Sequence, residues 1–203
     1  MDNLYKLRKS DLSGAGKVLA EAFREDPVWN KVFEGVPDRE RKLEAFFEIP
    51  VRFCRTYGEA YATSSEMEGI AAWVPGETAD MTVWRLLRSG AMGPGLKLGA
   101  TFSKRIQPIF EPLEKDRRLH MQGRRYIYLQ IIGVAPKHQG HGFGGKILRS
   151  LIAGSEKSGL PLYLETQTEK NVRMYEKLGF ETVKKFNLPV IDLPSWEMVR
   201  VPA

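Results

Sequence analysis

The 203-residue sequence contains one cysteine, three histidines and no long apolar run. The single cysteine, Cys54, excludes an intrachain disulfide and any zinc site built from paired cysteines. Its neighbours Ile49 to Phe53 have the character of the apolar side of a helix, so we predict a buried structural thiol. No apolar stretch approaches the roughly 18 residues that a membrane span needs. We therefore expect no metal site and no membrane partner.

Basic residues are in excess but are never clustered. The chain has 31 Lys and Arg against 25 Asp and Glu, a formal net charge of +6. Such an excess favours anionic ligands, whether nucleic acid, lipid or a polyphosphate cofactor. There is no block of five or more basic residues, and aromatic residues are not interleaved with basic ones as stacking on nucleic acid requires. We expect no nucleic-acid partner, which leaves either a solvated basic surface or attraction for a polyphosphate.

The chain length and its N-terminus favour a single cytoplasmic domain. A hydrophobic content of 42% is enough to bury a core in a domain of this length. Met1 to Tyr5 has neither a basic start nor an apolar stretch, so we expect no secretory signal. We predict one domain over residues 1–203 and a cytoplasmic location.

Apolar periodicity predicts an α/β (α+β) fold. Strands are expected at residues 4–8, 60–63, 69–74, 126–134, 161–165, 180–186 and 196–201, and helices at 11–24, 37–58 and 142–158. Thr166 and Glu169 have the spacing of a capping box that opens a further short helix, which Gly179 ends. Residues 77–122 mix helical spacing with glycine and proline. We predict an insertion of short helices and loops there, forming either a wall or lid of the site or a cover for one sheet face.

A glycine-rich segment, Gln139 to Lys146, joins the strand at 126–134 to the helix at 142–158. Glycines let backbone N–H groups approach a ligand, and a helix N-terminus carries partial positive charge, so this junction predicts a phosphate site. A dinucleotide motif, Gly140-x-Gly142-x-x-Gly145, does not follow its strand directly, and the roughly 60 residues after it are too few for a doubly wound sheet. A P-loop is excluded because Ile147 stands where a hydroxyl should hold magnesium.

A third motif fits without these conflicts. Its residues are Val134-x-Pro136-x-x-Gln139-x-x-Gly142-x-Gly144. With them, the sequence resembles the GNAT family of N-acetyltransferases. The resemblance extends to Leu164-Glu165-Thr166 and to Asn171-x-x-x-Tyr175-x-x-x-Gly179-Phe180, and Gly69 to Pro75 is similar to the puromycin-acetyltransferase-like branch. It implies the acyl-CoA N-acyltransferase fold, a mixed, splayed central sheet of about six to seven strands flanked by helices.

The resemblance also implies acetyl-CoA as the cofactor and a set of residues that bind it. Backbone amides of the glycine-rich segment would receive the pyrophosphate, from Gln139, Gly140, His141, Gly142, Phe143, Gly144, Gly145 and Lys146. Side chains placed to add charge near the phosphates are those of Lys137, His138, Lys146 and Arg149. Backbone groups of Ile132, Gly133 and Val134 would pair with the pantetheine amides along an opened strand edge, and Gly133 suits a bulge or a close backbone approach. Asn171 would bond the pantetheine.

Acetyl transfer needs a deprotonated amine and a proton for the leaving thiolate. An alkyl amine has a pKa near 10, so a base or a water chain must remove its proton. The resemblance implies Tyr175 as the general acid, the alternative being a core aromatic residue. Glu165 is the best candidate for the base, the alternative being a partner for the N-terminus of the next helix; Glu25, Asp26 and Glu34 are weaker candidates.

The expected activity is transfer of an acetyl group from acetyl-CoA to a primary amine of a small molecule. A non-catalytic CoA-sensing module, an acyltransferase acting on a hydroxyl and one using a longer acyl chain are the alternatives. The sequence does not name the acceptor, and it leaves the oligomeric state open, a homodimer included.

Overall fold

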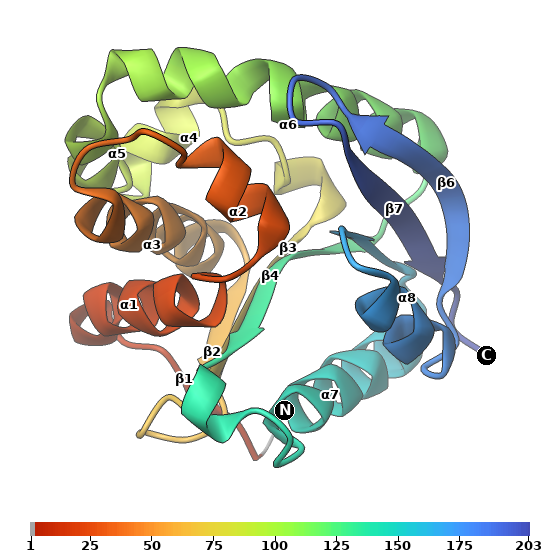
Figure 1. Cartoon of the computed structure of the whole chain (residues 1–203). Helices are drawn as coiled ribbons and strands as arrows, with labels where there is room; N and C mark the ends of the chain where they lie inside the picture. The colour runs from red at the N-terminus through yellow and green to blue at the C-terminus, as the bar shows by residue number, and fades with distance from the viewer. Residues whose placement is uncertain (1–2) are drawn as a thin grey trace.

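The computed structural model describes residues 3–203. Met1 and Asp2, on which the expectation of no secretory signal partly rests, lie outside the described residues. One sheet runs through the molecule, with helices on both of its faces (Figure 1). Between residues 3 and 203, no helix combines the length and the apolar character needed to cross a membrane.

The sheet has seven strands. They are β1 (Tyr5–Lys6), β2 (Glu59–Ala62), β3 (Gly69–Pro75), β4 (Ile127–Val134), β5 (Leu162–Thr166), β6 (Glu181–Leu188) and β7 (Leu193–Arg200). Their spatial order is β1-β2-β3-β4-β5-β7-β6. The β4–β5 pair is parallel and the other neighbouring pairs are antiparallel, which confirms the predicted mixed sheet; β2 and β3 form a hairpin.

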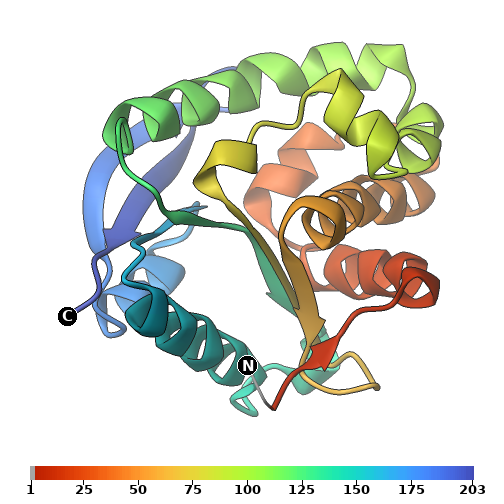
Figure 2. The ribbon, with the colours of Figure 1, turned by 180° about the vertical axis from the view of Figure 1, so that it is seen from behind.

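Eight α-helices are described between residues 3 and 203. They are α1 (Leu12–Ala22), α2 (Pro27–Val32), α3 (Arg39–Tyr57), α4 (Val83–Arg88), α5 (Met92–Leu98), α6 (Ala100–His120), α7 (Phe143–Ser158) and α8 (Glu169–Glu176). Three short 3-10 turns are η1 (Lys9–Asp11), η2 (Gly76–Thr78) and η3 (Pro136–His138). Helices α1 and α3 lie together, α7 and α8 lie together apart from them, and α6 runs along one end (Figures 1 and 2).

Side-chain alternation along the strands builds one apolar cluster on each face of the sheet. Tyr163 points into the cluster shared with α1, α3 and α6, whereas its neighbours Leu162 and Leu164 point into the cluster shared with α7 and α8. This is the two-residue period of a strand buried on both sides. Cys54 belongs to the first cluster and is fully buried, and burial raises the pKa of its thiol, which confirms a structural role.

Strands β4 and β5 pair over only two residues each. Ile127 pairs with Leu162 and Tyr128 pairs with Tyr163, and beyond these pairs β4 has no partner strand on that side among residues 3–203. The register between β3 and β4 shifts, because Ala72 lies opposite Ile131 while Trp73 lies opposite Leu129. Gln130 is therefore the extra residue of a β-bulge, and the divergence that the resemblance implied is present.

Gly133 is not the site of this bulge; its absent side chain serves helix packing instead. A Cβ at Gly133 would lie 2.9 Å from Leu19 Cδ2 and 3.1 Å from Ala22 Cβ. Only glycine lets α1 approach β4 this closely. The bulge expected at Gly133 is wrong, and the atoms that come close to it belong to side chains of α1 and Phe23.

The expectation of short helices and loops over 77–122 is wrong for its second half. Helix α6 continues for 21 residues through Pro108 and Pro112. Each proline removes a helical hydrogen bond, which is why the sequence favoured a break. Tertiary contacts compensate: Phe102, Ile109 and Leu113 form a buried stripe along the helix. Other α6 side chains bond α2, the α2–α3 connection and strand β6.

The predicted capping box at Thr166 is also wrong. Thr166 is the last residue of β5, where it is buried and opposite Trp196. Thr168 caps α8 instead, because its Oγ1 accepts a hydrogen bond of 3.3 Å from the Asn171 N–H. The strand therefore runs one residue further than predicted, which places Glu165 inside the sheet rather than at the helix N-terminus.

Candidate active site

A cavity of about 620 Å³ opens where β4 and β5 diverge. Residues Gln130 to Ile132 line one side of this gap, and Leu164 to Gln167 line the other. Asn171 and Tyr175 reach it from α8. The cavity continues beneath the helices that precede β4 in the chain, so a path leads from the sheet edge into a chamber between helices.

The pairing pattern of β3 decides which groups of β4 face this gap. Gly69 uses both of its backbone groups on the β2 side: its N–H donates to Thr63 Oγ1 at 3.1 Å, and its C=O accepts the Thr63 N–H at 3.0 Å. Backbone direction alternates along a strand, so the next residue, Ile70, faces β4, where its partner is Gly133.

Gly133 therefore directs its backbone groups at β3, while those of Ile132 and Val134 point into the gap. The Val134 C=O already accepts a hydrogen bond of 3.1 Å from the Gln139 side-chain amide. This corrects the expectation that all three residues present backbone partners to a ligand. The groups directed at the gap belong to Ile132 and Val134.

The glycine-rich loop presents a row of unpaired donors. Gly140 and Gly142 have φ values of 81° and 82°, a left-handed conformation that favours glycine. The Gln139 N–H bonds the Pro136 C=O at 3.2 Å and the Lys146 N–H bonds the Gly142 C=O at 2.9 Å, so these two amides are satisfied internally. Among residues 3–203, no acceptor partners the N–H groups of residues 140–145. Six amides at the start of α7 are therefore available to an anion, two fewer than predicted.

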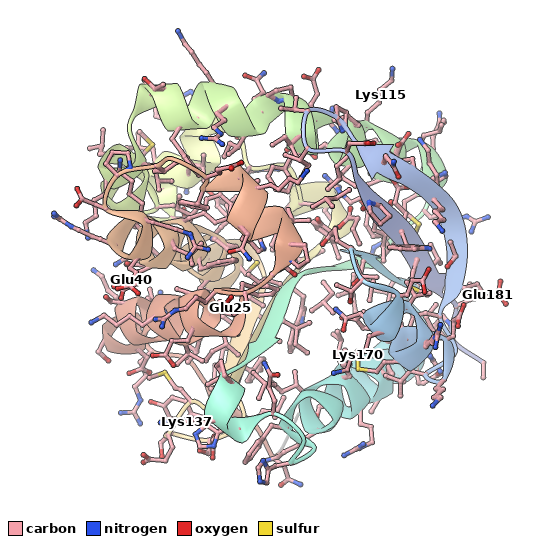
Figure 3. The ribbon with its side chains drawn as sticks, viewed as in Figure 1. Glu25, Glu40, Lys115, Lys137, Lys170 and Glu181 are labelled. Atoms are coloured by element: carbon pink, nitrogen blue, oxygen red, sulfur yellow. The ribbon has the colours of Figure 1, made fainter. Side chains whose placement is uncertain are left out.

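Side chains around the loop divide into those that hold it and those free to meet a phosphate. His141 Nδ1 lies 3.0 Å from the Gln139 carbonyl oxygen, which keeps the imidazole within the loop. The Lys146 ammonium donates to the Thr63 C=O at 2.9 Å, so its charge is directed at the β2–β3 hairpin and not at the phosphate site as expected. The Arg149 guanidinium lies beside Gly145, and Lys137 lies on the turn after β4 (Figure 3).

Asn171 and Tyr175 lie one turn apart on α8 and both line the cavity. The Tyr175 ring is 4% exposed and packs edge-on against Phe180, with ring centroids 5.4 Å apart. Burial raises the pKa of the Tyr175 phenol, so its hydroxyl carries a proton at neutral pH. The phenol is thus both packed in the core and at the gap.

Glu165 lies at the opposite wall of the gap, from β5. Tyr128 donates a hydrogen bond of 2.8 Å to Glu165 Oε2. Burial raises the pKa of Glu165 to about 8, against the opposing effects of this hydrogen bond and of the Arg117 charge. A carboxyl with a pKa in this range can exchange a proton near neutral pH, as a general base requires.

A network that sequence reasoning missed links Glu165 to helix α6. The Arg117 guanidinium lies 4.8 Å from the Tyr128 ring centroid, a cation–π contact, and is 2% exposed. Arg117 also donates to the Tyr126 hydroxyl at 2.9 Å and to Asp80 Oδ1 at 2.7 Å. Nothing in the sequence pairs Asp80 with Arg117 across 37 residues, so no local signal predicted this arrangement.

A second buried carboxyl, Glu197, lies directly opposite Glu165 across the β5–β7 pair. It is fully buried, accepts a hydrogen bond of 2.9 Å from the Tyr163 hydroxyl, and lies 2.9 Å from His120 Nδ1. Burial raises the pKa of Glu197 to about 7. Opposed residues on one sheet face have Cβ atoms about 5 Å apart, so ionising one carboxyl opposes ionising the other. The sequence feature that could have revealed Glu197 is a single glutamate next to the apolar residues of β7.

Of the weaker base candidates, the structure brings Asp26 alone to the cavity. Asp26 caps α2, and its Oδ1 accepts the Val28 N–H at 2.9 Å. Glu25 and Glu34 are exposed and do not line the cavity; Figure 3 places Glu25 at the connection between α1 and α2.

Comparison with known proteins agrees with this geometry. A family model described as an acetyltransferase (GNAT) domain matches residues 114–182, the segment that holds β4, the loop, α7, β5 and α8. The chain is 28% identical over 181 residues to an uncharacterized N-acetyltransferase of Schizosaccharomyces pombe, covering 86% of this chain and 72% of that protein.

Solved structures share the whole fold at low identity. One is a protein of Corynebacterium glutamicum described as histone acetyltransferase HPA2 and related acetyltransferase, with a TM-score of 0.67 at 19% identity, covering 99% of this chain and 96% of that one. Another is arylalkylamine N-acetyltransferase 2 of Aedes aegypti, with a TM-score of 0.58 at 14% identity over 98% of both chains. The puromycin-acetyltransferase-like branch stays a prediction. The motif residues, the unpaired loop amides and the diverging strands all fall on the segment that the family model matches. Residues 114–182 are thus similar to a GNAT acetyltransferase domain, and the sequence and fold comparisons support the GNAT family for this chain.

Proposed function

We propose that the protein transfers the acetyl group of acetyl-CoA to a primary amine of a small molecule. In this proposal residues 1–203 act as one domain, with 77–122 as a helical insertion. The observation that carries the proposal is the continuity of three features. Unpaired loop amides, an unpaired strand edge and a cavity with an acid and a base lie along one path.

The residues present fit coenzyme A along its length. The six amides of residues 140–145 suit a diphosphate, with Lys137 and Arg149 close to the loop. The edge groups of Ile132 and Val134 suit the amides of the pantetheine arm, as an added strand would. Asn171 lines the same gap and offers an amide side chain. Acetyl-CoA, when bound, supplies an acetyl group activated as a thioester.

Two side chains of the chain would then move protons. Glu165 takes the proton of the acceptor ammonium; its Oε1 has no hydrogen-bond partner among residues 3–203, while Oε2 is held by Tyr128. As the nitrogen–carbon bond forms and the carbon–sulfur bond breaks, the Tyr175 phenol protonates the leaving sulfur. The two groups come from opposite sheet faces, so each approaches the gap from its own side.

Ligand binding and turnover test this proposal together. Acetyl-CoA is expected to raise the melting temperature, whereas NADH and ATP–magnesium are not. With a panel of primary amines, free thiol should be released and the acetylated amine detected by mass spectrometry. Stabilisation by acetyl-CoA without turnover of any amine would favour a CoA-sensing module. No stabilisation at all would contradict the proposed binding site.

A further inference from the structure

Beyond the gap, the cavity is walled by aromatic rings from four elements. Phe23 follows α1, Trp29 lies in α2, Phe46 and Phe47 lie in α3, and Phe110 lies in α6. The Trp29 ring centroid is 4.7 Å from that of Phe46, 5.0 Å from that of Phe47 and 5.7 Å from that of Phe110. The rings pack on one another, so this wall is formed before any ligand binds. We call this part of the cavity the aromatic chamber.

The charged residues that line the cavity are all acidic. They are Asp26, Glu114 and Glu165, and within residues 3–203 no lysine, arginine or histidine lines it. This is notable because the whole chain carries a net charge of +6. Carboxylates favour a cationic ligand and oppose an anionic one, and aromatic faces attract organic cations.

We infer that the acceptor is a primary amine carried on a bulky apolar or aromatic group that bears no acidic group. The inference rests on the proposed acetyl transfer and names its acceptor class. The volume of about 620 Å³ lies within the range of sites that bury a drug-sized molecule. The amine would lie toward Glu165 at the gap, and the apolar group would lie against the wall that Trp29 and Phe110 help to form.

The same lining disfavours other amines. A polyamine could place only methylene segments against the aromatic wall, so it would bury less apolar surface there than an amine that carries an aromatic ring. An amino acid would bring a carboxylate among three acidic side chains. A long acyl chain would also suit the aromatic chamber, so its binding there is the competing outcome.

A matched pair of amines tests the inference directly. Tryptamine and tryptophan share the indole ring and the amine and differ by one carboxylate. We expect kcat/KM for tryptamine to exceed that for tryptophan, and that for spermidine, by at least about tenfold. If tryptophan or spermidine is acetylated as well as tryptamine, acetyl transfer stands and the inference is overturned. If no amine is acetylated, the proposed function fails and the inference falls with it.

Donors with different acyl-chain lengths show whether the aromatic chamber holds the acyl chain or the apolar group of the amine. If octanoyl-CoA is turned over faster than acetyl-CoA, and spermidine is then as good an acceptor as tryptamine, the aromatic chamber holds the acyl chain and the inference is overturned. We expect octanoyl-CoA to compete with tryptamine for the chamber and to be the poorer donor.

Two glycines of α5 provide a matched pair of variants. Gly95 lines the cavity and Gly93 does not, and a Cβ at either position would meet nothing within 4 Å. Gly95→Phe should fill part of the aromatic chamber and raise KM for tryptamine by at least about tenfold, leaving KM for acetyl-CoA unchanged. Gly93→Phe should leave both values within about twofold. Equal KM values for tryptamine in the two variants would contradict the inference.

Discussion

At the scale of single residues, two buried carboxyls face each other beside the gap. Glu165 and Glu197 face each other across β5 and β7, and burial raises the pKa of both groups. Tyr128 and Arg117 act in the opposite direction on Glu165, and Tyr163 does so on Glu197. The site therefore holds a carboxyl that is neither a permanent anion nor permanently neutral near pH 7.

Replacement of the proposed base, Glu165, is the first test at this scale. Glu165→Gln should lower kcat/KM by about 10²-fold or more, because the amine proton loses its acceptor. In the wild-type protein kcat/KM should rise with pH and level off above about 8, where Glu165 is ionised. Glu25→Gln, at an exposed position outside the cavity, is the control. A Glu165→Gln variant with the wild-type rate and the same pH profile would exclude Glu165 as the base.

The raised pKa of Glu165 also predicts how the free energy of unfolding changes with pH, and Glu165→Gln tests it. The pKa of Glu165 is about 8 in the folded chain against an ordinary value of 4.5. Between these values the unfolded chain has lost a proton that the folded chain keeps, so stability falls as pH rises from about 4.5 to about 8. Glu165→Gln removes this loss. Urea unfolding at pH 5, 7 and 9 measures the free energy of unfolding of both proteins. The value for the variant minus the value for the wild type should increase as pH rises. A difference that does not change with pH would refute the raised pKa.

The proposed acid has an equally conservative test. Tyr175→Phe keeps the ring that packs on Phe180 and removes only the hydroxyl. We expect kcat to fall by about 10²-fold while KM for acetyl-CoA stays nearly constant, because positioning by the gap persists. Steady-state kinetics over a range of pH measure this. Unchanged turnover at every pH would remove Tyr175 from the mechanism.

At the scale of elements, the loop and α7 form the part of the site that the sequence predicted best. Glycine spacing, a buried strand and an amphipathic helix are local signals, and each is visible within a few residues. Which amides are free was not predictable in full, because the bonds of Gln139 and Lys146 within the turn and helix depend on exact backbone geometry. The direction of the Lys146 side chain depends on Thr63, which is distant in sequence.

The two ends of α7 provide a matched test of the loop. Gly142 and Gly159 both have positive φ, at 82° and 66°, and a Cβ at either would meet nothing within 4 Å. Alanine at either position should cost about 1–2 kcal/mol of stability through backbone strain. Only Gly142→Ala should also raise KM for acetyl-CoA, by about tenfold, because it distorts the row of amides. Equal KM values in the two variants would show that the loop does not bind the cofactor.

Helix α6 shows where the sequence was least informative. Its prolines predicted a break, and its stability comes from contacts with α2, β6 and the Asp80 segment that no local pattern contains. The network from Arg117 through Tyr128 to Glu165 was missed for the same reason. Likewise, β5 extends to Thr166 because it pairs with β7, not because of its own composition.

At the scale of the whole molecule, the glycine-rich loop and the aromatic chamber lie on opposite sides of the diverging sheet. The loop and α8 lie on the side of α7 (Figures 1 and 2). The aromatic chamber is lined by residues of α2, α3 and α6. The gap between β4 and β5 is where they meet. The mixed sheet and its divergence followed from the family resemblance, whereas the acidic and aromatic lining of the chamber became visible only once distant segments were brought together.

The most direct test of this account is a crystal structure of the protein with coenzyme A bound. We expect diphosphate oxygens within about 3.2 Å of backbone amides of residues 140–145, and pantetheine amides paired with Ile132 and Val134. A coenzyme A molecule bound elsewhere, with the gap between β4 and β5 closed by side chains, would contradict it.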